Sequence, residues 1–224
     1  MTDNIISKYE SKLQDAGAEN VSEYIEKLGS NKNNTDVFED LLFEGLAASM
    51  LLSNGFEVKM RDSPDLDIKI NGSQFYAEVK HFRLKLQDNL DQEKMEATNA
   101  KLVTIGETKA TEGDEAWEQI AKVAEKKKGQ YVENSPNILV IGSSSPYSID
   151  DAIIPTAINI ISEKICGGSC RDLDKLNGIL LMSQEYNLRR KRNVFFFQNH
   201  NQRIPLDQII LESLYSIRNW EKQI

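Results

Sequence analysis

The sequence contains no apolar run long enough to cross a membrane. Its longest runs, such as residues 179–182, fall far short of the roughly 20 residues that a membrane-spanning helix needs. Residues 1–4 are polar and acidic, and they lack the basic and apolar regions of a secretory signal peptide. These absences predict a protein with no membrane partner, and we expect it in the cytoplasm.

Cysteine and histidine are scarce as well. The chain has two cysteines, Cys166 and Cys170, and two histidines, His81 and His200. A zinc site needs about four ligands of these kinds, and the histidines lie in sequence contexts of their own. We therefore expect two free thiols in a reducing compartment rather than a zinc centre.

Positive charge is in deficit, since 27 Lys and Arg face 35 Asp and Glu, for a net charge of −8. A protein that coats nucleic acid is normally basic, so this balance disfavours that class. It still allows a local basic groove along a phosphate backbone. Two runs are candidates for one, residues 126–128 and the run Arg189, Arg190, Lys191 and Arg192. Solvated charge at a helix end and at a turn explains both runs equally well.

Length and hydrophobic periodicity predict one α/β domain with a helical extension before it. Apolar residues recur at helical spacing over residues 3–29, 36–53, 115–128, 150–165 and 206–220, and strands are expected over residues 56–61, 66–70, 74–81, 138–141, 179–183 and 194–197. A mixed central sheet flanked by helices is the economical arrangement of these elements. We expect the extension over residues 1–34 and the α/β domain over residues 35–224. The charged segment 83–113 predicts only partial helix.

A β-hairpin carries the most informative polar pattern. Asn71-Gly72 is a strong hairpin signal, and it stands between two stretches of alternating apolar residues. With a two-residue turn, Asp65 lies opposite Glu78, with Cβ atoms about 5 Å apart. With a four-residue turn, Asp67 takes the place of Asp65. Either register therefore pairs two carboxylates across the hairpin.

Paired carboxylates repel each other unless a cation lies between them. Mg²⁺ is commonly held by one or two carboxylates together with water and phosphate oxygens. Lys80 follows Glu78 by two residues, so it lies on the same face of the strand. There it can orient a water molecule or stabilise charge on a phosphoryl group. The alternative is a solvated face with surface ion pairs worth about 0–1 kcal/mol each.

Glu44 is the second unusual carboxylate. It falls within the apolar stripe of the helix expected over residues 36–53, together with Val37, Leu41, Ala48 and Leu51. A carboxylate buried there without a partner would cost several kcal/mol. We therefore expect Glu44 to reach the polar pocket of the hairpin, as a direct or water-mediated metal ligand. A merely solvated hairpin face does not explain it.

These residues together resemble a motif of the PD-(D/E)XK nuclease superfamily, which has the restriction-endonuclease-like fold. The resemblance covers about residues 36–82 and is carried by Phe43-Glu44, by Pro64-Asp65 and, thirteen positions after Asp65, by Glu78-Val79-Lys80. An isolated Asp, Glu and Lys at such spacing is common by chance. The pairing on the hairpin, the shared face and the helix glutamate make the pattern more specific.

The resemblance implies a set of roles for these residues. Glu44, Asp65 and Glu78 would hold Mg²⁺ or Mn²⁺, and Lys80 would assist hydrolysis of a phosphodiester. Asp67 is the alternative to Asp65.

Many members of the superfamily add a lysine or glutamine from the next helix. Lys126 and Gln130 are the candidates for this accessory position, with Gln119 as a competitor.

The resulting hypothesis is a Mg²⁺-dependent nuclease with nucleic acid, expected to be DNA, as its partner. Endonuclease activity is expected, and a homodimer is one arrangement that we consider. Two alternatives keep the same fold. One is a non-catalytic module that binds nucleic acid or protein, and the other is a subunit of a larger defence or mobile-element system.

Overall fold

The computed structural model describes residues 2–82, 115–143, 151–183 and 194–217. The predicted partial helix over residues 83–113 lies outside the described residues. The basic run Arg189, Arg190, Lys191 and Arg192 also lies outside them.

Three helices precede the sheet, as the periodicity predicts. They are α1 (Thr2–Asp15), α2 (Val21–Ser30) and α3 (Thr35–Ser53). The first turn of α3 is capped by Asn34, whose side chain accepts a hydrogen bond from the backbone N–H of Val37 at 3.4 Å. At its C-terminal end, α3 is followed by Asn54 and Gly55, and Gly55 has a positive φ of 85°.

The centre of the molecule is a six-stranded sheet with the order β1-β2-β3-β4-β5-β6. The strands are β1 (Glu57–Met60), β2 (Leu66–Ile70), β3 (Ser73–Phe82), β4 (Asn137–Ser143), β5 (Leu176–Met182) and β6 (Val194–Gln198). The pairs β3–β4 and β4–β5 are parallel, and the other three pairs are antiparallel. The predicted mixed sheet with flanking helices is therefore confirmed.

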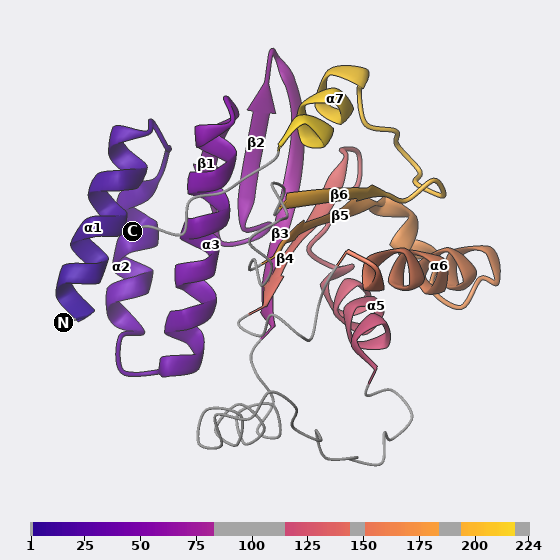
Figure 1. The fold of residues 1–224 in the computed structure, drawn as a ribbon, viewed down its shortest axis with the longest axis horizontal. Helices are drawn as coiled ribbons and strands as arrows, with labels where there is room; N and C mark the ends of the chain where they lie inside the picture. The colour runs from indigo at the N-terminus through magenta and orange to yellow at the C-terminus, as the bar shows by residue number, and fades with distance from the viewer. Residues whose placement is uncertain (1, 83–114, 144–150, 184–193, 218–224) are drawn as a thin grey trace, which may run out of the picture.

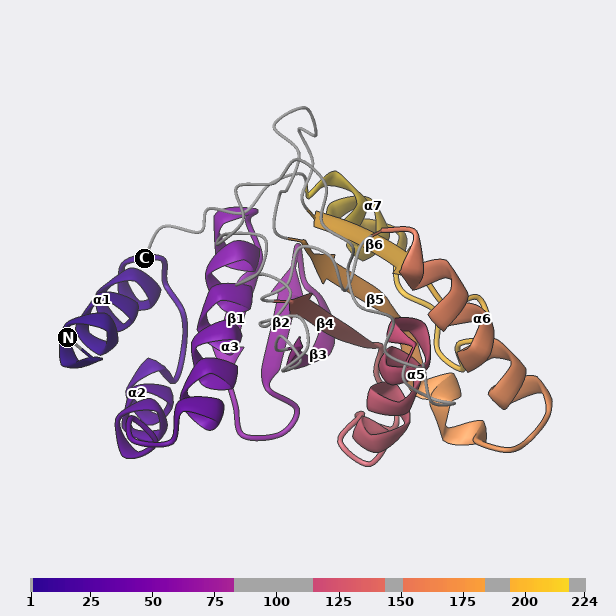
Figure 2. The ribbon, with the colours of Figure 1, turned by 60° about the horizontal axis from the view of Figure 1, so that its bottom comes forward.

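The remaining helices connect and cover the later strands. They are α5 (Ala116–Lys127), α6 (Ile153–Cys166), the short 3-10 helix η1 (Arg171–Lys175) and α7 (Gln208–Ser216). The two parallel connections, β3 to β4 and β4 to β5, run through α5 and α6 respectively. In the views of Figures 1 and 2, α3 lies on one side of the sheet and α5 and α6 lie on the other.

Two hydrophobic clusters fill the space on the two faces of the sheet. Along β4, Ile138 and Val140 belong to the cluster with α3, whereas Leu139 and Ile141 belong to the cluster with α5 and α6. All four side chains are fully buried, so the strand predicted over residues 138–141 is present and is covered on both faces. The site described below lies on β3, the neighbour of this strand.

The first two helices pack directly on α3. The hydroxyl of Tyr24 in α2 donates a hydrogen bond to the carbonyl oxygen of Leu41 in α3 at 2.7 Å. A Cβ atom at Gly45 would lie 2.4 Å from that hydroxyl oxygen and 2.7 Å from the ring of Tyr9. Leu13 and Leu28 share the cluster of α3 and the sheet. The domain boundary at residue 34 stays a prediction.

None of the helices in the described part of the chain is long and apolar enough to span a membrane.

Candidate functional site

The β2–β3 hairpin has the register expected for a two-residue turn. Ile70 pairs with Ser73, and the pairing continues in step to the far end of β2. Asn71 and Gly72 have φ values of 49° and 85°, which a tight turn of this kind requires and which Asn and Gly tolerate best. In this register, Leu66 pairs with Ala77, so the next residue, Asp65, lies opposite Glu78.

The turn length also decides the place of Asp67. It pairs with Tyr76 rather than with Glu78. One of its carboxylate oxygens accepts a hydrogen bond from Gln74 at 2.7 Å, and the other lies 3.8 Å from a guanidinium nitrogen of Arg61. Asp67, the predicted alternative to Asp65, thus contacts Arg61, which follows β1, and Gln74 of β3, and it does not pair with Glu78.

Asp65, which directly precedes β2, and Glu78, which lies on β3, are both buried. Asp65 is 5% exposed, and its Oδ2 accepts a hydrogen bond from the backbone N–H of Val79 at 2.7 Å. Glu78 is 1% exposed, and its Oε1 makes no hydrogen bond to any residue that the structure describes. An unsatisfied buried carboxylate oxygen is costly. The hairpin therefore holds two carboxylates where a cation would be favourable.

Lys127 in the last turn of α5 supplies one positive charge to this pair. Its Nζ lies 2.6 Å from Glu78 Oε2 and 3.8 Å from Asp65 Oδ2. The two residues of this segment predicted for the accessory position are Lys126 and Gln130. Lys126 is exposed and Gln130 is half-buried, and within the described residues neither has a recorded contact with Asp65 or Glu78.

Helical spacing contains the signal that identifies Lys127. The residue follows Ile120 by seven positions and Ala124 by three, so all three lie on one side of α5. Ile120 and Ala124 are fully buried. A lysine that continues a buried stripe is expected to meet a carboxylate, whereas its neighbour Lys126 faces solvent.

Glu44 is mostly buried, as its place in the apolar stripe predicts, with 13% of its side chain exposed. The Nζ of Lys27 in α2 lies 4.0 Å from its Oε2. Burial and the negative charge of Asp65 raise the pKa of Glu44 to about 8, and the positive charges of Lys27 and Lys127 oppose the shift. Glu44 therefore belongs to the electrostatic surroundings of Asp65.

The same causes act on Glu78. Burial and the charge of Asp65 raise its pKa to about 7, against the hydrogen bond and charge of Lys127. Burial lowers the pKa of Lys127, but the carboxylates outweigh it and the net shift is upward. The pKa values of Glu44 and Glu78 are raised because the lysines only partly offset the effects of burial and of the negative charge of Asp65.

Lys80 lies on the same strand as Glu78 and reaches toward α3. Its Nζ is 3.2 Å from Oδ2 of Asp40, and both side chains are 32% exposed. Asp40 precedes Glu44 by one helical turn, a spacing that places both on one side of α3. Asp40 was not among the predicted site residues, although its spacing from Glu44 is present in the sequence.

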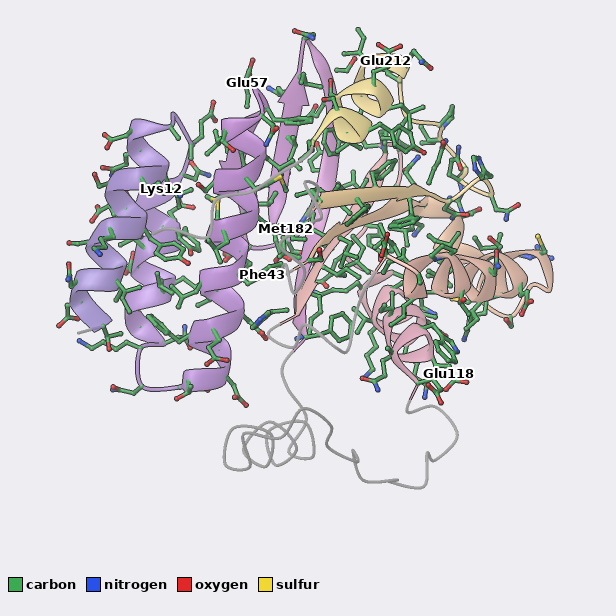
Figure 3. The ribbon with its side chains drawn as sticks, viewed as in Figure 1. Lys12, Phe43, Glu57, Glu118, Met182 and Glu212 are labelled. Atoms are coloured by element: carbon green, nitrogen blue, oxygen red, sulfur yellow. The ribbon has the colours of Figure 1, made fainter. Side chains whose placement is uncertain are left out.

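His81, the residue after Lys80 on β3, packs against α3. Its ring stacks on Phe43 with centroids 5.2 Å apart and an interplanar angle of 20°. Figure 3 labels Phe43 on the side of α3 that faces the sheet. A Cβ at Gly142 would lie 2.3 Å from the Phe43 ring, so glycine is required there for this close approach. The α3 helix is thus held firmly against the strand that carries Glu78 and Lys80.

The donor set allows a limited kind of metal site. Among the residues that the structure describes, no group of three or more His, Cys, Asp or Glu side chains lies close enough together to hold a metal ion. Asp65 and Glu78 are two hard oxygen donors with one unpaired buried oxygen. Mg²⁺ fits such a pair when water and substrate oxygens complete its shell. The role of Glu44 as a metal ligand stays a prediction.

The remaining candidates lie away from the carboxylate pair. Lys128, the last residue of the lysine run, lies with its Nζ 3.5 Å from the sulfur of Cys170. Both cysteines are free thiols, as expected, with Cys166 exposed and Cys170 buried.

Comparison with known proteins identifies no relative: no family model, no curated protein and no solved structure matches this chain at a significant level.

Proposed function

We propose that this protein is a Mg²⁺- or Mn²⁺-dependent nuclease that hydrolyses phosphodiester bonds of nucleic acid, with DNA as the expected substrate. The observation that carries the proposal is the buried pair of Asp65 and Glu78, in which Oε1 of Glu78 makes no hydrogen bond to any residue that the structure describes. A surface ion pair needs no such burial. The resemblance of the surrounding residues to the PD-(D/E)XK superfamily supports the same conclusion.

Asp65 and Glu78 would hold the metal ion. When bound, this ion would activate water and polarise the phosphodiester. The negative charge of Glu44 would add to the attraction for a cation, directly or through water. Because Asp65 is fixed by the Val79 N–H and Glu78 is fixed in the sheet, the two carboxylates are preorganised.

Lys80, two residues after Glu78 on β3, would assist the hydrolysis. Its side chain is partly exposed, so a substrate phosphate can reach it. An ammonium group there would stabilise negative charge that develops on the phosphoryl oxygens. Asp40 would hold Lys80 in position, since its Oδ2 lies 3.2 Å from the Lys80 ammonium nitrogen.

The test uses the purified full chain with plasmid, linear duplex DNA, single-stranded DNA and RNA. We expect cleavage with Mg²⁺ or Mn²⁺, and none with a chelator. Lys80→Met should abolish cleavage. Glu133→Gln, a change of an exposed carboxylate elsewhere, is the matched control. Metal-dependent cleavage of no substrate at all would contradict the proposal.

One observation favours a second candidate, a non-catalytic module that binds nucleic acid. Lys127 already bonds to Glu78, and Lys80 already bonds to Asp40. If these ion pairs have only a structural role, the protein would bind DNA in a salt-dependent way without cleaving it. Binding would then be unaffected by Lys80→Ala. A filter-binding series over a range of salt concentrations separates the two candidates.

A further inference from the structure

We propose that Lys127 is an internal cation that competes with the divalent metal for Asp65 and Glu78, so that metal and nucleic acid bind cooperatively. This inference deepens the proposed function and rests on it. It concerns the order and coupling of binding at the carboxylate pair.

The geometry places the Lys127 ammonium between the two carboxylates. Its Nζ contacts Glu78 Oε2 at 2.6 Å and lies 3.8 Å from Asp65 Oδ2. A divalent cation bound by these same two residues needs the space between their oxygens, because Mg²⁺–oxygen distances are about 2.0–2.1 Å. Two positive charges this close repel strongly in a partly buried pocket. The ammonium must therefore move when the metal binds.

Lys127 is placed so that it can move. It is the last residue of α5, and 23% of its side chain is exposed. A lysine side chain is long and flexible, so its ammonium can turn toward solvent while the helix stays intact. By contrast, Glu78 and Asp65 are buried in the sheet and cannot follow it. Metal binding would thus turn one positive charge outward.

Once it has turned outward, the Lys127 ammonium needs a new anionic partner. The phosphate backbone of a nucleic acid supplies one at the mouth of the site, and a lysine-to-phosphate contact is a charge-assisted hydrogen bond. Substrate would draw the Lys127 ammonium away from the carboxylates, and the vacated pair would bind metal more tightly. Because coupling between two ligands is reciprocal, bound metal would strengthen the binding of nucleic acid by the same factor.

The experiment measures Mn²⁺ binding to the full chain by calorimetry, with and without a short phosphorothioate duplex DNA that resists hydrolysis. For the wild-type protein we expect the duplex to tighten Mn²⁺ binding by roughly 5- to 150-fold, the usual range of coupling between sites. Lys127→Met should bind Mn²⁺ more tightly than the wild type without DNA, by a similar factor. The duplex should then produce no further gain in this variant.

Two further variants control the measurement. Lys122→Met removes an exposed lysine of the same helix and should behave like the wild type. Lys127→Gln provides a second, polar replacement, so that a folding defect of the methionine variant does not decide the result. The melting temperature with and without Mn²⁺ reports folding and binding together.

The outcomes separate this inference from the proposed function. Equal or weaker Mn²⁺ binding by both Lys127 variants, or no Mn²⁺ binding by any variant, overturns the competition. Tighter binding by both variants, with coupling to DNA in the wild type alone, supports it. Failure of the wild-type protein to cleave unmodified DNA with Mn²⁺ overturns the nuclease function alone, since the binding measurements do not depend on hydrolysis.

Discussion

Two groups of charged side chains have the same composition and opposite surroundings. The hairpin cluster consists of Glu44, Asp65, Glu78, Lys27 and Lys127. The surface cluster consists of Glu133, Asp172, Asp174, Lys175 and Arg203, beside η1 and the segment before α7. Each therefore has three carboxylates and two bases. They differ in burial, since Glu78 is 1% exposed and the Glu133 side chain is 62% exposed.

The comparison shows that burial, rather than the number of charges, determines which side chains in a cluster have shifted pKa values. In the surface cluster, hydrogen bonds with Glu133 and Asp174 raise the pKa values of Lys175 and Arg203 respectively. In the hairpin cluster, burial is the largest cause, and it raises the pKa values of Glu44 and Glu78 to about 8 and about 7. A further cation would therefore stabilise the buried carboxylates of the hairpin cluster.

The largest expected effect is on activity. Glu78→Gln keeps the size of the side chain but removes its charge, so we expect cleavage to fall by about 100- to 1,000-fold. Glu133→Gln makes the same change in the surface cluster and should leave the rate unaltered. Initial rates on plasmid DNA with Mg²⁺ measure both. Equal loss in the two variants would remove the distinction between the clusters.

The next effect is on stability without divalent metal. Lys127→Met leaves Asp65 and Glu78 without their ammonium, and breaking such a buried pair should lower the free energy of unfolding by about 3 kcal/mol at pH 8. The loss should shrink at pH 5, where Glu78, with its raised pKa of about 7, takes up a proton. Urea unfolding at the two pH values measures it. A loss that is the same at both values would contradict the electrostatic cause.

A third effect concerns pH. Glu44 and Glu78 have folded-state pKa values of about 8 and about 7, raised above the ordinary glutamate value of 4.5. Their stabilising contribution is therefore complete below about pH 4.5. It is lost as the pH rises through 7 and 8. Glu44→Gln should flatten this decline and raise the free energy of unfolding at pH 8 by about 2 kcal/mol.

The measurement for this third effect is a series of urea unfolding curves from pH 5 to pH 9. Glu133→Gln is again the control, because its carboxylate is exposed and paired at the surface. A wild-type stability that rises over this range would show that the two carboxyl pKa values are not raised.

The smallest effect should be found in the surface cluster. Glu133→Gln breaks contacts with Lys175 and Arg203, and exposed ion pairs are worth only about 0–1 kcal/mol. We expect a change of that size in the free energy of unfolding, and we expect it to vanish in high salt. A loss as large as that of Lys127→Met would mean that burial is not the deciding difference.

Much of the fold and part of the hairpin cluster could be predicted from the sequence because the signals are local. Alternation placed Glu78 and Lys80 on one face of a strand, and Asn71-Gly72 defined a turn whose register the structure confirms. The apolar stripe of α3 indicated that Glu44 is buried. The choice between Asp65 and Asp67 stayed open until the turn length was known.

Lys127 and Asp40 could not be identified with equal ease. Helical spacing favours Lys127 among three consecutive lysines, but the docking of α5 against β3 decides which carboxylate it meets. Asp40 lies forty residues before its partner Lys80. Its contact depends on how α3 is packed against the sheet by Phe43 and His81.

By itself, the sequence determined which residues share a face, because periods of 2 and 3.6 residues are properties of the backbone. It therefore determined the buried strand β4, the carboxylate face of the hairpin and the inward side of α3. Only the tertiary structure decided which cation lies between the carboxylates. Glu78 and Lys127 are separated by 49 residues and meet at 2.6 Å because the parallel connection from β3 to β4 brings α5 back across the sheet. A contact across such a crossover depends on the packing of whole elements, whereas local periodicity indicates only which side chains face inward.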